Sequence, residues 1–174
     1  MALNVKIKKL HQNAVIPSYS KIGDAGLDLT AVDKYYDVHG CVVYNTGIAL
    51  EIPEGYVGLI FPRSSICRQD LSLVNSVAVI DSGYRGEIIV KFKPSLMFVS
   101  DEKGLISDDD DKFQCADGVE IPWDDRIPIS AIDYQIGERI AQLIIMPYPR
   151  IEFQEVEELS ETERGDGGFG SSGK

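Results

Sequence analysis

The densest group of side chains that can do chemistry lies between Asn75 and Ile88, in the run Asn-Ser-Val-Ala-Val-Ile-Asp-Ser-Gly-Tyr-Arg-Gly-Glu-Ile. Asp81 lies at a predicted tight turn, where a carboxylate can act as a general base. Tyr84 can lie flat on a sugar ring, and backbone groups at the mouth of a hairpin can read the edge of a pyrimidine. The same residues also suit an ordinary β-hairpin with Asp-Ser-Gly turn chemistry. The segment alone leaves both interpretations open.

A second group follows a predicted strand end and can grip an anion. The run from Phe61 to Arg68 contains a proline followed by Arg63, Ser64 and Ser65. Arg63 offers a planar fork of donors that suits a phosphate, and the serines add hydroxyl and backbone N–H groups. If a helix begins here, its N-terminal end also attracts anions. A helix cap of the same composition is equally common, so a phosphate grip and a cap both stay open.

Two further segments hold charged residues that need a partner. Asp24 and Asp28 are four residues apart with a glycine between them, a spacing that could hold a hydrated metal ion. Taken alone, a turn leading into a strand is favoured there. Arg139 lies in an otherwise apolar run, and an arginine on the buried side needs a carboxylate or a ligand. A structural ion pair is favoured for Arg139, and Gln142 adds a polar group nearby.

The end of the chain has a composition of its own. From Glu163 to Lys174 it is rich in glycine and small polar residues, with one arginine, Arg164, and one aromatic residue, Phe169. Such a composition is typical of a disordered end, which is favoured on composition alone. The arginine, the aromatic ring and two hydroxyls among glycine-rich backbone amides can also close over a phosphate chain and stack on a base.

Short β-rich runs separated by turn residues must position these groups, because helical periodicity is almost absent. The turns have the sequences Pro-Glu-Gly, Asp-Ser-Gly and Ile-Gly-Glu. Many short strands predict an all-β sandwich or barrel. One short helix is predicted at Ser64–Asp70. The predicted strands are Asn4–Leu10, Val42–Ile52, Tyr56–Phe61, Leu73–Ile80, Glu87–Lys93 and Arg139–Pro147.

One segment, Pro94–Ser130, interrupts the strand pattern and is strongly acidic. Between Asp101 and Asp125 it holds ten acidic and two basic residues, which supply most of the chain's net charge of −11. The acidic run lacks the ordered ligand spacing of a calcium loop, so a solvated surface loop is favoured over a cation site. We expect a β-domain at residues 1–159 that contains this acidic insert, followed by a flexible glycine-rich segment at residues 160–174.

Composition narrows the class of protein further. With 174 residues, 44% of them apolar, the chain can bury a core, and its apolar runs are too short to span a bilayer. The net charge of −11 argues against a nucleic-acid-binding surface. The N-terminus has no signal-peptide pattern, so we expect a soluble, cytoplasmic protein with neither a membrane nor a nucleic-acid partner. No Walker loop and no dinucleotide fingerprint occur, and neither histidine lies in a motif.

The three cysteines, Cys41, Cys67 and Cys115, are widely and irregularly spaced. An odd count with this spacing fits neither a disulfide framework nor a zinc site, so reduced thiols are expected. Cys67 falls inside the arginine–serine segment. For this residue a small buried filler is favoured over a nucleophile.

Taken together and in order, five segments resemble the trimeric dUTPase family, the deoxyuridine 5′-triphosphate nucleotidohydrolases. The resemblance covers nearly the whole chain except the insert, and five modest motifs in order make a specific pattern. The third segment, which contains Ile-Asp-Ser-Gly-Tyr-Arg-Gly-Glu, is the densest. The five segments are Asp24–Ala31, Pro62–Arg68, Asn75–Ile88, Gly137–Leu143 and Arg164–Gly173.

The resemblance implies a jelly-roll-like β-fold with a C-terminal arm, a homotrimer and three shared active sites. Each site would take the first, second and fourth segments from one chain, the third from a neighbour and the fifth from the remaining subunit. The implied reaction is attack of water on the α-phosphorus of dUTP, which gives dUMP and pyrophosphate with the help of Mg²⁺. Such a reaction needs charge neutralisation and alignment more than covalent help.

The resemblance also implies roles for particular residues. Asp81 would activate the attacking water, Asp28 would order water around Mg²⁺, and Tyr84 would pack on the deoxyribose and exclude a 2′-hydroxyl. Arg139 would act structurally near the site. Phosphate contacts are implied for Arg63, Ser64, Ser65 and Gln142. Uracil contacts are implied for Asn75 and for the backbone of Val79 and Ile80. A closing lid would use Arg164, Phe169, Gly170, Ser171 and Ser172, with Phe169 over the uracil.

The chain departs from the family pattern at two places, and two other functions are possible interpretations. Ala78 stands where the family usually has glycine, and the insert is longer than the usual connection. The related dCTP deaminase family shares the fold and the turn, but its deaminating glutamate would fall at about Lys91, and a lysine cannot serve as that base. A non-enzymatic jelly-roll protein that keeps a nucleotide site as a switch is the second alternative. The presence of Asp28, Asp81 and Tyr84 argues against it.

Overall fold

The structure is a computed structural model that describes residues 2–69, 71–94, 112–114, 120–122 and 133–168. In these residues, nearly all regular structure is β-strand. One sheet contains β1 (Lys6–Lys9), β3 (Asp33–Tyr36), β4 (Val42–Glu51), β6 (Leu71–Leu73) and β8 (Glu87–Pro94). A second contains β2 (Leu27–Thr30), β5 (Tyr56–Pro62), β7 (Ala78–Ile80) and β11 (Arg139–Pro147). A separate hairpin joins β9 (Lys112–Gln114) and β10 (Glu120–Pro122).

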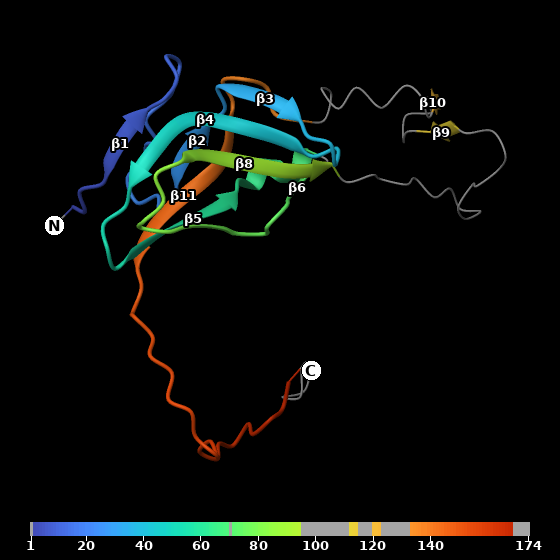
Figure 1. The fold of residues 1–174 in the computed structure, drawn as a ribbon. Coiled ribbons are helices and arrows are strands. Elements are labelled where there is room, and N and C mark those ends of the chain that lie inside the picture. The colour runs from blue at the N-terminus through green and yellow to red at the C-terminus, as the bar shows by residue number, and fades with distance from the viewer. Residues whose placement is uncertain (1, 70, 95–111, 115–119, 123–132, 169–174) are drawn as a thin grey trace.

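The two larger sheets lie face to face, with β4 and β8 in front of β11 and β5 in Figure 1. The strand order is β1-β4-β8-β6 in the first sheet, where β3 also pairs with β4, and β2-β11-β5-β7 in the second; every pairing is antiparallel. Two antiparallel sheets that bury their inner faces against each other form a β-sandwich. The predicted all-β sandwich is confirmed.

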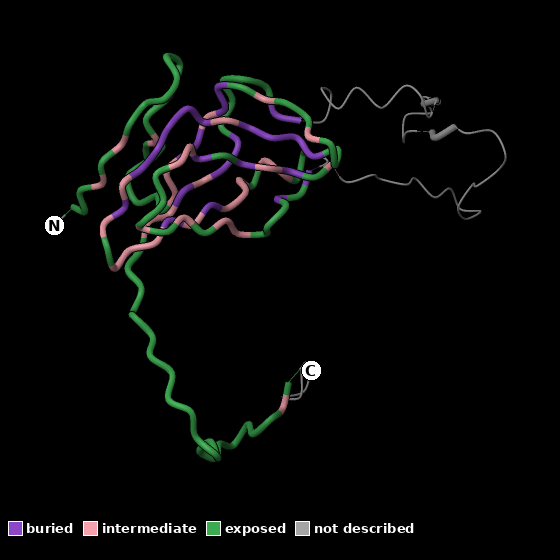
Figure 2. Tube along the Cα trace, in the orientation of Figure 1, coloured by how far each residue is buried: buried purple, intermediate pink, exposed green. Residues whose placement is uncertain are grey.

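The inner faces of the two sheets supply the core. β8 alternates, with Ile88, Val90 and Phe92 at most 1% exposed and their neighbours turned outward, as expected for a strand with one solvated face. β4 is buried along almost its whole length. Figure 2 shows the buried trace running along both strands and along β11. Burying each large apolar side chain contributes roughly 1.5–3 kcal/mol, so these strands hold the rigid part of the fold.

Most strand predictions are confirmed to within a few residues, and the bounds of β11 agree with the prediction at both ends. The predicted strand Leu73–Ile80 is wrong, because it is two strands in different sheets, β6 and β7. Between them Asn75 and Ser76 form a turn in which Ser76 has a φ of 58°, a left-handed conformation that is rare for serine. Asn75 and Ser76 are residue types that favour turns, but without a glycine or proline they are a weak signal inside an otherwise apolar run.

Two further predictions need correction. The residues from Ala78 to Glu87 do not form a hairpin, because β7 pairs with β5 and β8 pairs with β4 and β6, so this segment crosses from one sheet to the other. The predicted helix at Ser64–Asp70 is a single 3-10 turn at Ser64–Arg68 without a side-chain cap. A turn this short adds little dipole, so an anion held here would be gripped by side chains.

After β11 the chain leaves the β-domain as an extended segment. Tyr148 still donates its N–H to the Gly55 carbonyl, after which the chain runs away from the two sheets and then turns back before Gly168 (Figure 1). No helix among the residues that the structure describes is long and apolar enough to cross a membrane.

Candidate active site

The Asp28 carboxylate joins three of the predicted segments. Arg63 Nε donates to one of its oxygens at 2.9 Å, and Arg139 Nη1 donates to the other at 3.0 Å. Asp28 lies on β2, Arg139 begins β11 beside it, and Arg63 follows the end of β5 on the other side of β11. The sheet order therefore brings the first, second and fourth segments together in one chain. The predicted ion pair of Arg139 is confirmed, although this side chain is 52% exposed rather than turned to the buried side.

Ser20 completes this cluster, and sequence reasoning missed it. Its hydroxyl donates to Asp28 at 2.8 Å and accepts from Arg139 Nη1 at 2.9 Å. Ser20 stands in a loop outside every motif, and a serine in a loop carries no signal that a strand eight residues later will use it. Asp24, which the sequence paired with Asp28, is turned elsewhere and accepts from the backbone N–H of Lys21.

The surroundings of Asp28 hold it in the ionised form. Burial by itself would raise the pKa of the carboxyl, but the hydrogen bond from Ser20 and the charge of Arg63 lower it, as do the hydrogen bond and charge of Arg139. Together they outweigh burial and set the pKa below its ordinary value. The cluster is thus a fixed negative charge that holds two guanidinium groups in place.

Arg63 keeps part of its donor fork available. Its Nη1 lies 3.3 Å from the Arg139 carbonyl and 3.5 Å from Ser65 Oγ, while Nη2 makes no hydrogen bond among the described residues. Ser65 Oγ also lies 3.1 Å from the Tyr134 hydroxyl. The segment therefore presents a guanidinium edge beside a serine hydroxyl, which is the donor set that an anionic oxygen requires.

Cys67 of the second segment and Gln142 of the fourth lie close to this cluster in sequence or in the sheet. Cys67 is exposed, so its prediction as a buried filler is wrong. Its thiol contacts the Ser64 carbonyl at 2.9 Å. Gln142 lies on β11, opposite Asp28 of β2 on one side and Phe61 of β5 on the other. Its side chain passes over Gly26. A Cβ on Gly26 would lie 3.1 Å from Gln142 Cβ, so the glycine of the first segment makes room for this amide.

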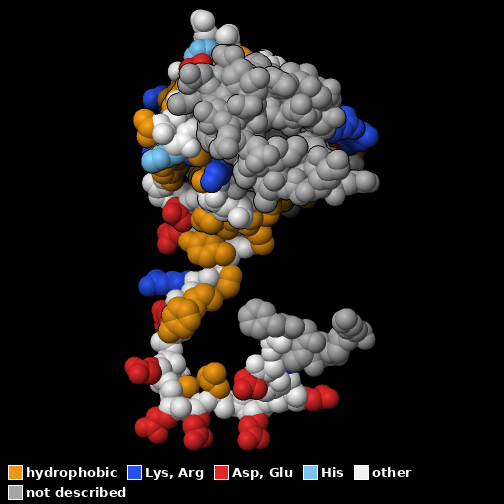
Figure 3. Space-filling view, turned by 90° about the vertical axis from the view of Figure 1, so that its right-hand side faces the viewer, with side chains coloured by type: hydrophobic (Ala, Val, Ile, Leu, Met, Phe, Trp, Pro, Cys, Tyr) orange, Lys and Arg blue, Asp and Glu red, His pale blue; other side chains and the backbone are white. Residues whose placement is uncertain are grey.

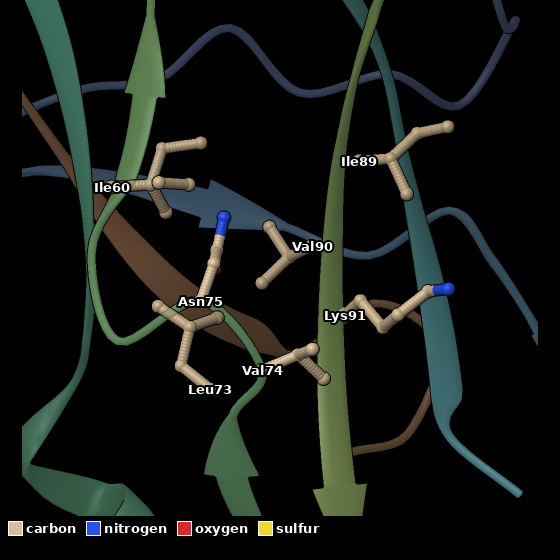
Figure 4. A pocket seen from close by; sticks show the side chains of 8 residues that line it. Ile60, Leu73, Val74, Asn75, Ile89, Val90 and Lys91 are labelled. Atoms are coloured by element: carbon tan, nitrogen blue, oxygen red, sulfur yellow. The ribbon is translucent and has the colours of Figure 1, made fainter. Parts of the chain in front are cut away.

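Residues of the third segment help to line two small pockets. One, of about 140 Å³, is lined by apolar side chains together with Asn75, Ala78 and Lys91. Figure 4 shows the Asn75 side chain lying between those of Ile60 and Val90. A single amide in an apolar hollow of this size suits a flat polar ring edge. The Ala78 methyl group lies in its wall, where the family usually has none.

The second pocket has a volume of about 160 Å³ and holds Asp81 and Tyr84 in its wall. The other lining residues are Val79, Ile80, Glu87 and Ile89, and Ile89 also lines the first pocket. Within the described part of the chain, the Asp81 carboxylate makes no hydrogen bond or ion pair, so both oxygens can accept from a water. The Tyr84 hydroxyl donates to the Glu87 carbonyl at 3.0 Å, which fixes the ring as one side of the pocket.

Gly86 leaves room for the Tyr84 ring, and Glu87 holds the ring in this position. A Cβ on Gly86 would lie 2.3 Å from the Tyr84 hydroxyl, so any side chain there would displace the ring. The Glu87 carboxylate accepts from the Gly47 N–H at 2.8 Å and from Asn45 Nδ2 at 2.9 Å. These two bonds anchor the start of β8 to the bulge of β4, where the pairing register shifts.

The two halves of the candidate site are far apart within one chain. Ile80 pairs with Gly58, so Asp81 follows toward the beginning of β5, whereas Arg63 follows its end. The six residue-to-residue steps from Val57 to Arg63 span roughly 20 Å at about 3.3 Å per step. We call the group around Asp28, made of Ser20, Asp28, Arg63, Ser65 and Arg139, the anion-gripping cluster. It lies too far from the Asp81 pocket for one small ligand to contact both within this chain.

The last segment is only partly described. Arg164 Nε donates to the Gly167 carbonyl at 2.9 Å, and Gly165 donates to Thr162, so these contacts stay within the segment. The predicted lid residues Phe169, Gly170, Ser171 and Ser172 lie outside the described residues. Figure 3 shows apolar side chains along the first part of this arm and acidic side chains along the rest. Its most exposed apolar residues are Ile151, Phe153 and Leu159.

A direct metal site is not built from these residues. Among those the structure describes, no group of three His, Cys, Asp or Glu side chains could hold an ion. Asp28 has three of its roughly four acceptor positions occupied by Ser20, Arg63 and Arg139. The remaining position fits one water molecule of a hydrated cation whose other ligands come from elsewhere, such as phosphate oxygens.

Comparison with known proteins gives a consistent result. A sequence model of the family described as dUTPase matches residues 12–95 and 128–173. The chain is 36% identical over 174 residues to a deoxyuridine 5′-triphosphate nucleotidohydrolase of Hydrogenobaculum sp., covering 98% of this chain and 99% of that one. It is 38% identical over 172 residues to the enzyme of the same name from Corynebacterium glutamicum, covering 98% and 95%.

Solved structures agree. A mutant of the Staphylococcus bacteriophage 80alpha dUTPase, solved with dUpNHpp, is similar over 99% of this chain and 100% of that one, with a TM-score of 0.70 and 30% identity. A mutant dUTPase from phage phi11 of S. aureus, described with a structural Mg(II) ion, has a TM-score of 0.65 and 26% identity over 91% of this chain and 100% of that one. The expected jelly-roll-like fold is confirmed by these likenesses.

Proposed function

The chain belongs to the dUTPase family, and on that premise we propose that it hydrolyses dUTP to dUMP and pyrophosphate at a site shared between subunits. The single observation that carries this proposal is the pocket in which an unpaired Asp81 carboxylate faces the fixed Tyr84 ring. A general base and a flat sugar platform side by side are what hydrolysis of a deoxynucleotide requires. Relatives that cover nearly the full length carry the same activity in their names.

Base and sugar are recognised by the third segment. Asn75 and the backbone of Val79 and Ile80 contact the uracil, and Asn75 brings the only amide of the apolar pocket beside β7. Tyr84 packs on the deoxyribose. Gly86 leaves room for its ring, and the hydrogen bond to the Glu87 carbonyl holds the ring there as a wall against a 2′-hydroxyl.

The phosphate chain is held by the cluster around Asp28. Arg63, Ser64 and Ser65 contact phosphate oxygens, and Gln142 adds an amide from β11. Arg139 contributes by holding Asp28 and thereby the guanidinium of Arg63, not by touching substrate. Charged donors that are already in place cost little reorganisation when negative charge develops in the transition state.

Asp81 takes a proton from the attacking water. The new bond forms between the water oxygen and the α-phosphorus, and the bond from the α-phosphorus to the bridging oxygen breaks, so pyrophosphate leaves with that oxygen. The proton passes to an Asp81 oxygen, which is open to solvent in the free chain. The products are dUMP and pyrophosphate.

Mg²⁺ fits this scheme as an ion carried by the triphosphate. Asp28 would hold it through one ordered water, since its fourth acceptor position is open. Bound there, the ion neutralises phosphate charge and aligns the chain of phosphates. The likeness to a phage dUTPase described with a structural Mg(II) ion supports a cation in this family.

A homotrimer completes each site. The roughly 20 Å between Arg63 and Asp81 along β5 supports a site in which the third segment of one chain meets the Asp28 cluster of another. The arm after β11 runs away from its own domain with Phe153 97% exposed, which suits a segment that packs on a neighbour. Residues 160–174 would then serve as a lid over the site of the remaining subunit, with Arg164 on phosphate, Phe169 over the uracil, and Gly170, Ser171 and Ser172 closing around the phosphates.

The nearest alternative, deamination of dCTP, has a lysine at the position expected for its glutamate base. Lys91, where the deaminating glutamate would fall, donates to Asp37 at 2.7 Å. This ion pair joins β8 to the turn between β3 and β4. The cytoplasmic location expected from the sequence stays a prediction.

Pyrophosphate release from four nucleotides tests the function. We expect rapid release from dUTP, and values of kcat/KM that are at least about a hundredfold lower for UTP, dTTP and dCTP, because buried polar groups and rigid walls discriminate by such factors. Replacing Tyr84 with alanine should raise the relative rate for UTP without improving that for dTTP. Ammonia release from dCTP, or equal hydrolysis of UTP and dUTP by the unmodified protein, would refute the proposal.

A further inference from the structure

Tyr134 lies outside the five motifs, yet the structure places its hydroxyl in the anion-gripping cluster. The residue stands five positions before Arg139 and is only 3% exposed. Its hydroxyl lies 3.1 Å from Ser65 Oγ, which belongs to a segment 69 positions earlier in the chain. A buried tyrosine whose hydroxyl reaches a serine of this cluster can orient the hydroxyl of that serine.

The Tyr134 ring is held in one position from several sides. Its centroid lies 6.3 Å from that of Tyr44 and 5.9 Å from that of Phe92, in edge-on and tilted contacts. Its backbone carbonyl accepts from the Tyr44 hydroxyl at 3.0 Å and from Lys34 Nζ at 3.2 Å. The neighbouring Asp133 is fixed by Lys34 and by the Tyr36 hydroxyl. The Tyr134 hydroxyl is therefore presented at a fixed point.

The hydrogen-bond inventory of Ser65 gives this contact a direction. A serine hydroxyl has two acceptor lone pairs and one proton. Arg63 Nη1 can only donate, and it lies 3.5 Å from Ser65 Oγ. If the Tyr134 hydroxyl donates as well, both lone pairs of Ser65 are used. The one proton of Ser65 must then point away from both donors, toward any acceptor that arrives.

We infer that Tyr134 is a positioning residue that sets the Ser65 hydroxyl as a donor to the triphosphate. The inference rests on the proposed function, because it assigns a purpose to a serine that this function places on phosphate. Tyr134 itself touches no substrate. It acts through Ser65, and its effect should concern the hold on the phosphate chain, not proton transfer at Asp81.

The test compares two tyrosine-to-phenylalanine variants from the same aromatic cluster. Tyr134→Phe keeps the ring and removes the donor to Ser65. Tyr44→Phe is the matched control, since it removes an equally buried hydroxyl whose partner is the Tyr134 carbonyl. That carbonyl keeps its bond from Lys34. Initial rates of pyrophosphate release against dUTP concentration give kcat and KM for each variant and for Ser65→Ala.

For Tyr134→Phe we expect KM for dUTP to rise about five- to tenfold with kcat within about twofold, the size of one lost hydrogen bond in ligand binding. Tyr44→Phe should keep both constants, because the ring contacts and the hydrogen bond from Lys34 still hold Tyr134 in place. In Ser65→Ala, adding Tyr134→Phe should change KM by less than about twofold, because the serine through which it acts is gone.

Other kinetic results distinguish failure of this inference from failure of the proposed function. A merely structural role would reduce the amount of active enzyme, so kcat would fall with KM unchanged, and that result would overturn the inference. An undiminished effect of Tyr134→Phe in the Ser65→Ala background would also overturn it, as would wild-type constants for Tyr134→Phe alone. If the unmodified protein does not hydrolyse dUTP, the proposed function fails instead. Because KM does not depend on enzyme concentration, a partly unfolded variant still gives a valid reading.

Discussion

Asp28 shows how much one side chain can organise at the scale of single residues. Its two oxygens accept from Ser20, Arg63 and Arg139, which belong to three separate parts of the chain. The carboxylate therefore sets the direction of the guanidinium that is proposed to meet phosphate. Sequence reasoning found the two arginines and the aspartate, but it missed Ser20 and Tyr134. Their roles depend on contacts between distant segments, which no local pattern records.

The lowered pKa of Asp28 predicts an acid-dependent loss of stability. Because the pKa is lower in the folded state than in the unfolded chain, this carboxylate stabilises the fold fully above its ordinary pKa of about 3.9. The contribution is lost as pH falls through the lower folded value. Asp28→Asn should be less stable than the unmodified protein by about 2 kcal/mol at pH 7.

Urea unfolding of both proteins at several pH values checks this prediction. The difference in the free energy of unfolding should be constant from about pH 7 to pH 5 and should shrink below about pH 4. Asp24→Asn is the matched control, since Asp24 bonds only a backbone N–H in an exposed loop. A difference that stays the same down to pH 2.5 would contradict the role given to the charge of Asp28.

Asp81 provides the chemical prediction at the same scale. Asp81→Asn keeps the shape of the side chain but cannot accept a proton, so kcat should fall by ~10² to 10⁴. Affinity for dUTP and the assembly state should survive, because the Asp81 carboxylate makes no hydrogen bond or ion pair among the described residues, and its backbone carbonyl, which accepts from the Tyr84 N–H, is unchanged in the variant. Single-turnover rates and titration with a non-hydrolysable dUTP analogue measure the two effects separately. Turnover near that of the unmodified protein would remove Asp81 from the proposed role.

At the scale of elements, the order of strands decides which motifs meet. Neighbours β2, β11 and β5 bring Asp28, Arg139 and Arg63 together, and the same order places β7 at the opposite edge from β2. The sequence was sufficient to predict the long strands β4 and β11, because their apolar patterns match their burial. It was insufficient for the division between β6 and β7. That division depends on the left-handed conformation of Ser76, which tertiary structure imposes on a residue that does not favour it.

The acidic insert gives a prediction about a whole element. Replacing residues 95–130 with a short polar turn should leave assembly and dUTP hydrolysis within about threefold of the unmodified protein, because a segment of this charge density buries little apolar area. Pro94 should be kept, since it pairs with Leu71 in β6, and so should Asp133, which Lys34 and Tyr36 hold. Size-exclusion chromatography and steady-state kinetics measure the outcome. An unfolded or inactive shortened chain would show that the insert is structural.

At the scale of the whole molecule, the prediction concerns sites completed by several subunits. Two inactive chains, Asp81→Asn and one truncated after Thr162, are unfolded together and refolded as a mixture. If each site takes Asp81 from one subunit and the tail from another in fixed cyclic order, every mixed trimer has one site with an intact Asp81 and an intact tail. Mixed trimers should then regain roughly a third of the unmodified activity, as the symmetry of a closed ring requires.

The controls for this experiment are the two homotrimers, which should remain inactive. Native mass spectrometry establishes how many mixed trimers have formed. If Asp81 and the tail met within one chain, every site of a mixed trimer would carry one defect. Activity no greater than the sum of the parents, in a sample that contains mixed trimers, would reject the shared site.

The central claim is that water activated at Asp81 attacks the α-phosphorus of dUTP, and hydrolysis in ¹⁸O-labelled water tests it most directly. Attack at the α-phosphorus puts the oxygen of water into the nucleotide product. After complete hydrolysis, mass spectrometry should find one ¹⁸O atom in dUMP and none in pyrophosphate. Label in pyrophosphate would mean attack at the β-phosphorus, and labelled inorganic phosphate with dUDP would mean attack at the γ-phosphorus. Either result would contradict the proposed chemistry.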